Sequence, residues 1–310
     1  MKEAQSLWQN APRINKDAIF IADSHFMPLH LQPLPKQGEI ASKALLDYFK
    51  TLLKNPAQIP SQIFLMGDIT HLLLGGVKSS VDTHKELLDS ICTLSQVSQV
   101  WWFEGNHDFG LNALQKRAEF SKIHFIPRSK QPLAFSYIDE SIDKNTPHLE
   151  SKPESKGESK PKSQNVLLAH GDLFLNTKYE LYIRCMQTKI MRWLLTLLDS
   201  VTFGNLYTFI AKKVNHNTIR QGKTDIESFA KKRICAYNAY LQNAIKKAQA
   251  LADEQIDMII EGHFHIGKAY KGESLYISLP SFYLTRSIFS IESATSNEAK
   301  STIQSTKESD

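Results

Sequence analysis

The sequence predicts an α/β fold, and three observations support this prediction. Short apolar runs rich in β-branched and aromatic residues recur along the chain, as expected of buried strands. Amphipathic helical patterns lie between the first three of these runs. Strands and helices therefore alternate, as they do in sheets that are covered by helices. Five of the runs are followed at once by residues able to bind metal ions, which predicts a functional site at the strand ends.

The predicted strands and helices follow from these patterns in order. The five apolar runs cover residues 18–22, 62–66, 99–103, 165–169 and 256–260. One amphipathic helix is predicted over residues 39–54, where Pro56 ends the pattern, and a second over residues 82–94. Two further apolar runs, 275–279 and 282–289, predict strands that close the sheet.

The chain is expected to form a single domain over residues 1–310, because this length suits one large α/β domain with insertions. Residues 139–164 are almost free of apolar side chains and rich in Ser, Lys, Glu and Pro, which predicts a disordered surface loop. Residues 293–310 have the same character and predict a flexible tail. Between residues 173 and 250 helical periodicity replaces the strand pattern, which predicts an insertion of two to four helices.

Composition is that of an ordinary soluble globular protein, with 42% hydrophobic and 22% charged residues. The net charge of +5 is unevenly distributed: residues 173–250 hold 13 Lys and Arg against 4 Asp and Glu, a net of +9, and the rest of the chain sums to −4. The three cysteines are far apart and show no CxxC spacing, so they indicate neither a disulfide framework nor a thiolate zinc site.

The sequence shows no segment that would direct it out of the cytoplasm. Its first residues contain no apolar run that approaches a signal-peptide core, and nowhere is there a stretch of about 18 apolar residues. We therefore expect a cytoplasmic protein, at most associated with a membrane surface.

The residues that follow the five strands are metal-capable and carry no thiolate. They form the clusters Asp23-Ser24-His25, Gly67-Asp68, Gly105-Asn106-His107-Asp108, His170-Gly171-Asp172 and Gly262-His263-Phe264-His265. Carboxylate, imidazole and amide ligands suit divalent Mn, Fe or Zn, and glycine lets the backbone turn tightly beside them. His263 and His265 would point the same way if their segment were extended. Each cluster alone is also common in turns, but five together favour a metal site.

The ordered set DxH, GD, GNHD, HGD and GHxH resembles the calcineurin-like metallophosphoesterase superfamily, from about residue 18 to residue 289. The resemblance implies a four-layer αββα sandwich with a helical lid insertion and two divalent metal ions, which we expect to be Mn²⁺, with Fe or Zn as alternatives. The implied ligands are Asp23, His25 and His265 for one ion, Asn106, His170 and His263 for the other, and Asp68 bridging both. Asn106 and His107 would bind the substrate, and His107 would be catalytic by assisting the leaving group.

Within that superfamily the sequence is most similar to the UDP-2,3-diacylglucosamine diphosphatases of lipid A synthesis, in its length, its Asn106-to-Phe109 run and its basic helical insertion after HGD. In those enzymes the insertion covers the acyl chains, and UMP and a diacylglucosamine 1-phosphate are released. The resemblance implies a lipid-linked nucleotide as substrate. The many apolar residues of the stretch 181–210, with Lys and Arg between them, indicate contact with acyl chains or with the cytoplasmic face of the inner membrane. The alternative is that these helices pack on one another and on the sheet, with Lys and Arg in solvent. The best-known branch has arginine in place of His107, and many relatives have aspartate in place of His71.

Other functions use the same ligand set. Related enzymes cleave other phosphomonoesters, phosphodiesters or nucleotides, and a nuclease would use the +9 segment to hold a phosphate backbone. Because apolar residues crowd that segment and no nucleic-acid motif is recognised, we expect no nucleic-acid partner. A non-catalytic protein bound to a membrane surface would lack ligands, whereas every ligand position of the family is filled here.

Overall fold

The structure is a computed structural model, and it describes residues 7–8, 10–138, 163–216, 219–222, 225–248 and 254–291. Its strands are β1 (Arg13–Ile14), β2 (Ile19–Ile21), β3 (Gln62–Leu65), β4 (Leu73–Leu74), β5 (Gln99–Phe103), β6 (Asp108–Phe109), β7 (His124–Ile126), β8 (Leu133–Ile138), β9 (Ser163–Ala169), β10 (Met258–Glu261), β11 (Lys268–Lys271), β12 (Leu275–Ser278) and β13 (Phe289–Ser290). Its α-helices are α1 (Lys36–Lys54), α2 (Lys78–Thr83), α3 (Lys85–Leu94), α4 (Thr177–Met186), α5 (Lys189–Val201), α6 (Asn205–Asn215), α7 (Ile226–Ala248) and α8 (Phe282–Thr285). Short 3-10 helices lie at Pro56–Gln58, Leu111–Lys116, Ala118–Phe120 and Arg128–Lys130.

Two large sheets form the centre of the fold. One has the strand order β13-β2-β3-β5-β7 and the other the order β1-β8-β9-β10-β12-β11, while β4 and β6 form a small parallel pair. The neighbours β2, β3 and β5 run parallel, and so do β9, β10 and β12. Parallel neighbours have their carboxyl ends on the same edge of a sheet, so each sheet presents several strand ends together.

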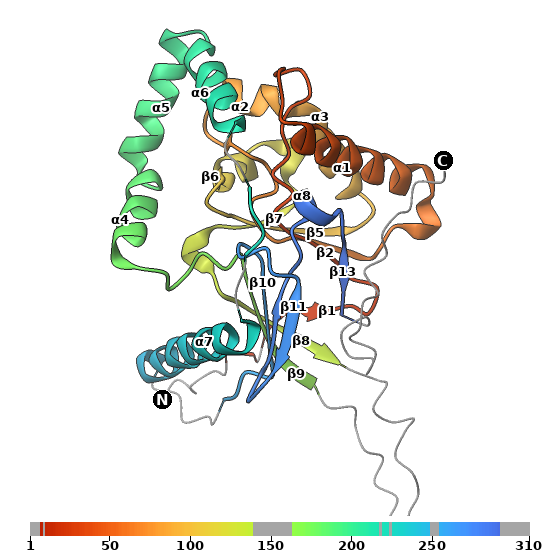
Figure 1. The fold of residues 1–310 in the computed structure, drawn as a ribbon, viewed down its shortest axis with the longest axis vertical. Helices are drawn as coiled ribbons and strands as arrows, with labels where there is room; N and C mark the ends of the chain where they lie inside the picture. Colours follow the sequence, from red (N-terminus) through yellow and green to blue (C-terminus); the bar gives the residue numbers. More distant parts are fainter. Residues whose placement is uncertain are drawn as a thin grey trace, which may run out of the picture.

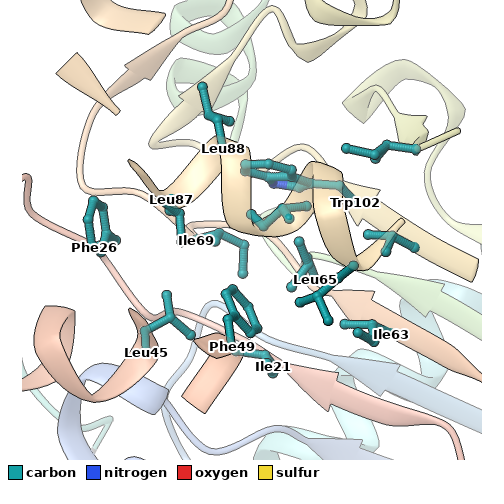
Figure 2. Close-up of a cluster of buried hydrophobic side chains, with 14 of the residues drawn as sticks. Ile21, Phe26, Leu45, Phe49, Ile63, Leu65, Ile69, Leu87, Leu88 and Trp102 are labelled. Carbon is teal, nitrogen blue, oxygen red and sulfur yellow. The ribbon is translucent and has the colours of Figure 1, made fainter. Parts of the chain in front are cut away.

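Buried side chains fill the space between the two sheets and cover both outer faces. Phe20 and Phe64 of one sheet stack at 4.6 Å and pack against side chains of the other, such as Phe135. On the outer face of the five-stranded sheet, Ile21, Leu65 and Trp102 pack against helices α1 and α3 (Figure 2). Because successive strand residues point to opposite faces, Phe20 and Ile21 serve different layers of the core.

Helix α7 covers the outer face of the six-stranded sheet, where Ala230, Ile234 and Tyr237 pack against Leu167 and Tyr276. The layer order is therefore helix, sheet, sheet, helix, and the predicted four-layer αββα sandwich is confirmed (Figure 1). Helices α4, α5 and α6, here called the α4–α6 segment, stand apart from α7 on one side of the sandwich (Figure 1). The range 173–250 assigned to one insertion thus holds two parts, because α7 belongs to the outer layer.

Several predicted boundaries differ from the structure. The helix predicted over residues 82–94 is broken at His84, whose Nδ1 donates to the Ser80 carbonyl at the end of α2. The strand predicted over residues 282–289 is mostly the single turn α8, followed by β13. The main-chain N–H groups of Leu284 and Thr285 both donate to the Ser281 carbonyl, which closes this helical turn.

The predicted disordered segments fall almost wholly outside the described residues. This holds for residues 139–162 and for the predicted tail 293–310, whereas residues 163 and 164, assigned to the loop, begin strand β9.

Candidate metal centre

The eight candidate residues lie just beyond the carboxyl ends of five strands. Asp23 and His25 follow β2, Asp68 follows β3, and Asn106 and His107 follow β5, while His170 follows β9 and His263 and His265 follow β10. The strands come from both sheets, so the residues meet where the two layers of the sandwich open at one edge. The structure brings all eight together, as the sequence predicts, and their binding of metal stays a prediction.

Asp23, His25 and His265 form the first group, with one ligand atom of each within 4.8 Å of the others. The Nε2 atom of His265 lies 3.5 Å from Oδ1 of Asp23 and 3.5 Å from Nε2 of His25. Asp23 is fully buried, and its carboxylate accepts the main-chain N–H of His263 at 3.0 and 2.9 Å. The second group therefore touches the first through the His263 backbone.

Asp68, His170 and His263 form the second group under the same 4.8 Å limit. The Nε2 atom of His170 lies 3.5 Å from Oδ2 of Asp68 and 3.4 Å from Oδ1 of Asn106. Ligand atoms about 2.1 Å from a cation lie roughly 3.0 to 3.4 Å from one another, depending on the coordination geometry. The separations in both groups are close to this range, so the residues present fit the cations that the resemblance implies.

Hydrogen bonds to main-chain carbonyls orient two of these imidazoles. Nδ1 of His170 donates to the Met66 carbonyl and Nδ1 of His265 donates to the Arg220 carbonyl, each at 2.9 Å. Since a carbonyl oxygen only accepts, both Nδ1 atoms carry the proton and both Nε2 atoms face the carboxylates. Metal-binding histidines are commonly held in this way by an outer partner.

The electrostatics of the centre also fit cations. Burial would lower the pKa of His170 and of His265, but the charges of Asp68 and Asp23, respectively, raise both above the usual histidine value. Burial likewise would raise the pKa of Asp68, yet the positive charge of His170 holds it well below its usual range. The negative charges of the buried carboxylates thus stabilise positive charge beside them, whether it is a proton on an imidazole or a bound cation.

His25 and His263 behave differently from the other two imidazoles. Burial lowers the pKa of His25 well below the usual value and that of His263 to about 3, with the charge of His170 contributing to the latter shift. Neutral imidazole is the form that binds a metal. Both side chains are therefore ready to act as ligands at neutral pH without losing a proton.

Backbone strain is concentrated at the centre. Five of the eight described non-glycine residues with positive φ belong to it: Asp23, His25, Asp68, His263 and His265. Positive φ is rare for such residues and gathers at functional sites. The segment holding His263 and His265 is therefore not extended, which corrects the reason given for the two imidazoles pointing the same way, and the two side chains join different groups.

Two glycines permit the close approach of the loops. A Cβ atom on Gly67, whose φ is +87°, would lie 2.3 Å from Nδ1 of His170, and a Cβ atom on Gly105 would lie 2.2 Å from Oδ1 of Asp68. Both separations are shorter than any ordinary contact, so a side chain at either position would push a ligand out of place.

In the GNHD motif, His107 lies beside the metal groups and Asp108 has a structural role. The main-chain N–H of His107 donates to Oδ1 of Asp68, and its Nδ1 donates to the His71 carbonyl, each at 2.8 Å. Its Nε2 is thereby left for other partners. Asp108 faces away from the metal groups and instead accepts N–H bonds from Ile69, Thr70 and Trp102. Asp108 holds the loop that carries Asp68.

Arg233 is a supporting residue that sequence reasoning missed. It was counted in the basic surface of residues 173–250, but it is only 5% exposed. Its guanidinium donates to the carbonyls of Gly171 and Leu173 and to the Glu261 carboxylate, at 2.7 to 3.1 Å in all. It thus joins the loops of His170 and His263. Spacing gives the signal: Arg233 is four residues before Tyr237, on the buried face of α7.

Arg128 plays a similar part for the HGD motif. Its Nε donates to Oδ2 of Asp172 at 2.6 Å, and its terminal nitrogens donate to Glu180 of α4. Tyr179 also donates its hydroxyl to Asp172. Asp172 is therefore a structural member of the motif that links the centre to the α4–α6 segment.

The fold and this arrangement of side chains place the protein among the metal-dependent hydrolases. More closely, the chain belongs to the calcineurin-like phosphoesterase family, whose family model matches residues 18–267. It is therefore a metal-dependent phosphoester hydrolase, and the resemblance seen in its motifs is confirmed at the level of the family. No curated protein sequence matches the chain.

The solved structures that are similar to this chain include two with low sequence identity. A dimetal phosphatase from Danio rerio has 14% sequence identity and a TM-score of 0.38, with 87% of this chain and 89% of that chain covered. A conserved uncharacterised protein from Streptococcus pneumoniae, described as a predicted phosphoesterase, has 10% identity and a TM-score of 0.26, with 86% of this chain and 72% of that chain covered. Such low scores add nothing to the family assignment.

Proposed function

We propose that the protein hydrolyses the pyrophosphate bond of UDP-2,3-diacylglucosamine, releasing UMP and a diacylglucosamine 1-phosphate. The observation that carries this proposal is a large exposed apolar surface on the α4–α6 segment, whose last helix contacts His71 beside the metal centre. The resemblance of the sequence to diphosphatases of lipid A synthesis supports the same substrate. Hydrolysis of another phosphomonoester, phosphodiester or nucleotide is the alternative that the experiment below separates.

The roles of the centre follow from its geometry. Asp23, His25 and His265 would hold one divalent cation, and Asn106, His170 and His263 the other, with Asp68 shared between them. When bound, two such cations activate a water for attack and neutralise charge on the phosphoryl oxygens. Manganese is the cation we propose, because oxygen and imidazole ligands suit it.

His107 would contact the phosphate and assist the leaving group. Its Nδ1 is committed to the His71 carbonyl, and its ring lies 4.9 Å from that of His25, beside the first metal group. Only Nε2 can then reach a substrate, and in the protonated ring it donates to the oxygen that leaves. Proton donation of this kind is typically worth about 10² to 10⁴ in rate.

The apolar surface has the chemistry of an acyl-chain site. On α5, Ile190, Trp193, Leu197 and Val201 recur at helical spacing and all are exposed, Ile190 at 78%. Phe203, between α5 and α6, is 91% exposed. Soluble monomers seldom leave such a stripe in water, so a lipid chain or surface is the expected partner.

The same segment carries positive charge suited to anionic lipid. Lys189, Lys212 and Lys213 are exposed on α5 and α6, and Arg184 is exposed on α4. Among the described residues no single helix is long and apolar enough to cross a membrane, while α5 and α6 together pass that test and are bent by 110° at their junction. We propose that the segment rests on the cytoplasmic face of the inner membrane, with apolar side chains in the lipid and lysines at the head groups.

The substrate is tested with purified protein, manganese and a panel: UDP-2,3-diacylglucosamine, UDP-N-acetylglucosamine without acyl chains, cyclic nucleotides, an aryl phosphate and DNA. The proposal predicts UMP release from the acylated substrate with the highest kcat/KM of the panel. Loss of the acyl chains should lower kcat/KM by more than about tenfold, since each buried CH₂ contributes about 0.8 kcal/mol. Faster cleavage of any other member would overturn the lipid assignment and leave the enzyme class standing.

A further inference from the structure

His71 is buried beside the metal centre but belongs to neither metal group as assigned above. It lies in the turn between β3 and β4, where its main-chain N–H donates to the Phe26 carbonyl at 3.0 Å and its own carbonyl accepts from Nδ1 of His107. Its ring stacks on that of His107, with centroids 5.2 Å apart and planes 22° apart, and meets His25 edge-on at 5.5 Å. The His71 side chain thus packs directly against the imidazoles of His107 and His25.

The other end of this imidazole reaches the α4–α6 segment. Nε2 of His71 donates to the Val214 carbonyl at 2.9 Å, and Val214 is the penultimate residue of α6. The last carbonyls of a helix have no partner within the helix, so this bond satisfies one of them. Because a carbonyl cannot donate, His71 carries its proton on Nε2.

A second bond joins the same turn to the same helix. The hydroxyl of Tyr207 donates to the Leu72 carbonyl at 2.9 Å. Tyr207 and Val214 are seven residues apart, two helical turns, so both contacts lie along one face of α6. The turn that holds His71 and Leu72 therefore attaches α6 to the sandwich through two hydrogen bonds. Of these two bonds, the one from His71 is made by a side chain that also contacts the imidazoles of His25 and His107.

We propose that His71 is a positioning residue that fixes the end of α6 beside His107 and His25, so that α6 forms one wall of the substrate site in register with the metal centre. Substrates long enough to reach the α4–α6 segment then depend on His71 for binding, whereas small phosphate esters do not. The part about long substrates rests on the function proposed above; the anchoring of α6 does not.

The test compares four variants. His71→Leu removes the bond to Val214, and His71→Gln keeps a donor near the position of Nε2. Tyr207→Phe removes the second anchor without changing the His71 imidazole. His84→Leu is the matched control, since His84 is an equally buried histidine whose ring donates within its own helix end.

Amide hydrogen exchange of α6, with α7 as internal reference, gives the first readout. We expect exchange in the last turn of α6 to rise about five- to tenfold in His71→Leu, as for loss of one hydrogen bond, and to return to wild type in His71→Gln. Tyr207→Phe should raise exchange near the start of α6, and His84→Leu should leave α6 unchanged. Unchanged α6 exchange in His71→Leu, or the same rise in His84→Leu, would overturn the proposal whatever the substrate proves to be.

Kinetics give the second readout. For the lipid-linked substrate, His71→Leu should raise KM about five- to tenfold with kcat within about twofold, and His71→Gln should restore KM. Both constants for an aryl phosphate should stay within about twofold. An equal loss of kcat on both substrates would contradict a positioning role. If the wild type cleaves no lipid-linked substrate, the proposed function fails, and α6 exchange alone decides the role of His71.

Discussion

The sandwich and the α4–α6 segment treat apolar and polar side chains in opposite ways. In the sandwich, apolar side chains fill three buried layers, and buried charged groups such as Arg233 and Glu261 are paired and hydrogen-bonded. In the α4–α6 segment, large apolar side chains such as Trp193 and Phe203 face outward. The difference teaches that the sandwich buries its own apolar side chains, whereas the segment leaves apolar surface exposed for the lipid proposed above.

The largest expected effect lies in the sandwich. Asp68→Ala should abolish phosphoester hydrolysis, by more than about a thousandfold in kcat/KM, because it removes the carboxylate that we propose to bridge the two metal ions. Steady-state kinetics with an aryl phosphate measure the loss, and circular dichroism checks that the variant is folded. Turnover close to that of the wild type would refute the bridging role of Asp68.

The network below the centre should come next in size. Arg233→Met leaves the buried Glu261 carboxylate unpaired, which should cost about 3 to 5 kcal/mol of unfolding free energy. It also frees the loops of His170 and His263, so affinity for Mn²⁺ should fall about 10- to 100-fold in calorimetric titrations. Lys231→Met, on an exposed turn of the same helix, is the control and should change neither quantity. Equal metal affinity in the two variants would show that Arg233 does not support the centre.

The buried residue His84 should make the unfolding free energy of the sandwich depend on pH. Burial lowers the pKa of His84 to about 4, so its neutral form contributes stability above the unfolded value of 6.5 that is lost as pH falls toward 4. Over this window the wild type should lose about 3 kcal/mol more unfolding free energy than His84→Gln, as expected for a shift of 2.5 pKa units. Urea unfolding at several pH values measures this; parallel curves for the two proteins would contradict the buried neutral state.

The smallest effect on the fold is expected in the α4–α6 segment. Ile190→Ser with Trp193→Ser should weaken binding to anionic vesicles at least about tenfold, because each side chain contributes roughly 1.5 to 3 kcal/mol when buried in lipid. Hydrolysis of an aryl phosphate should not change, since neither residue is in the metal centre. Val97→Ser, which alters another apolar residue that is 63% exposed, is the control for vesicle sedimentation. Equal binding by all three proteins would remove the membrane proposal.

The sequence predicted the strands and the site residues far better than the buried arginines that hold the site loops. Strands β2, β3, β5, β9 and β10 were visible because each short apolar run is followed directly by one of the five motifs. The eight site residues could be found for the same reason. Arg233 and Arg128 could not be separated from surface charges, because burial of a charged side chain depends on partners distant in sequence, here Glu261 and Asp172.

Backbone conformation was the other feature that the sequence did not reveal. Left-handed φ at His263 and His265 goes against local preference, so the residue pattern of this segment suggested an extended conformation that the structure does not have. Similarly, α8 replaced a predicted strand, and its turn is closed by the main-chain N–H groups of Leu284 and Thr285, which donate to the Ser281 carbonyl. Local pattern identified which residues matter and left their exact directions to packing.

The most direct test of the metal centre is a crystal structure of the protein grown with manganese, with anomalous scattering measured to locate the ions. We predict two ions, one held by Asp23, His25 and His265 and the other by Asn106, His170 and His263, with an oxygen of Asp68 between them. Ligand distances should be about 2.0 to 2.3 Å. An ordered centre that holds no ion, or ions bound elsewhere with these side chains unliganded, would contradict the account.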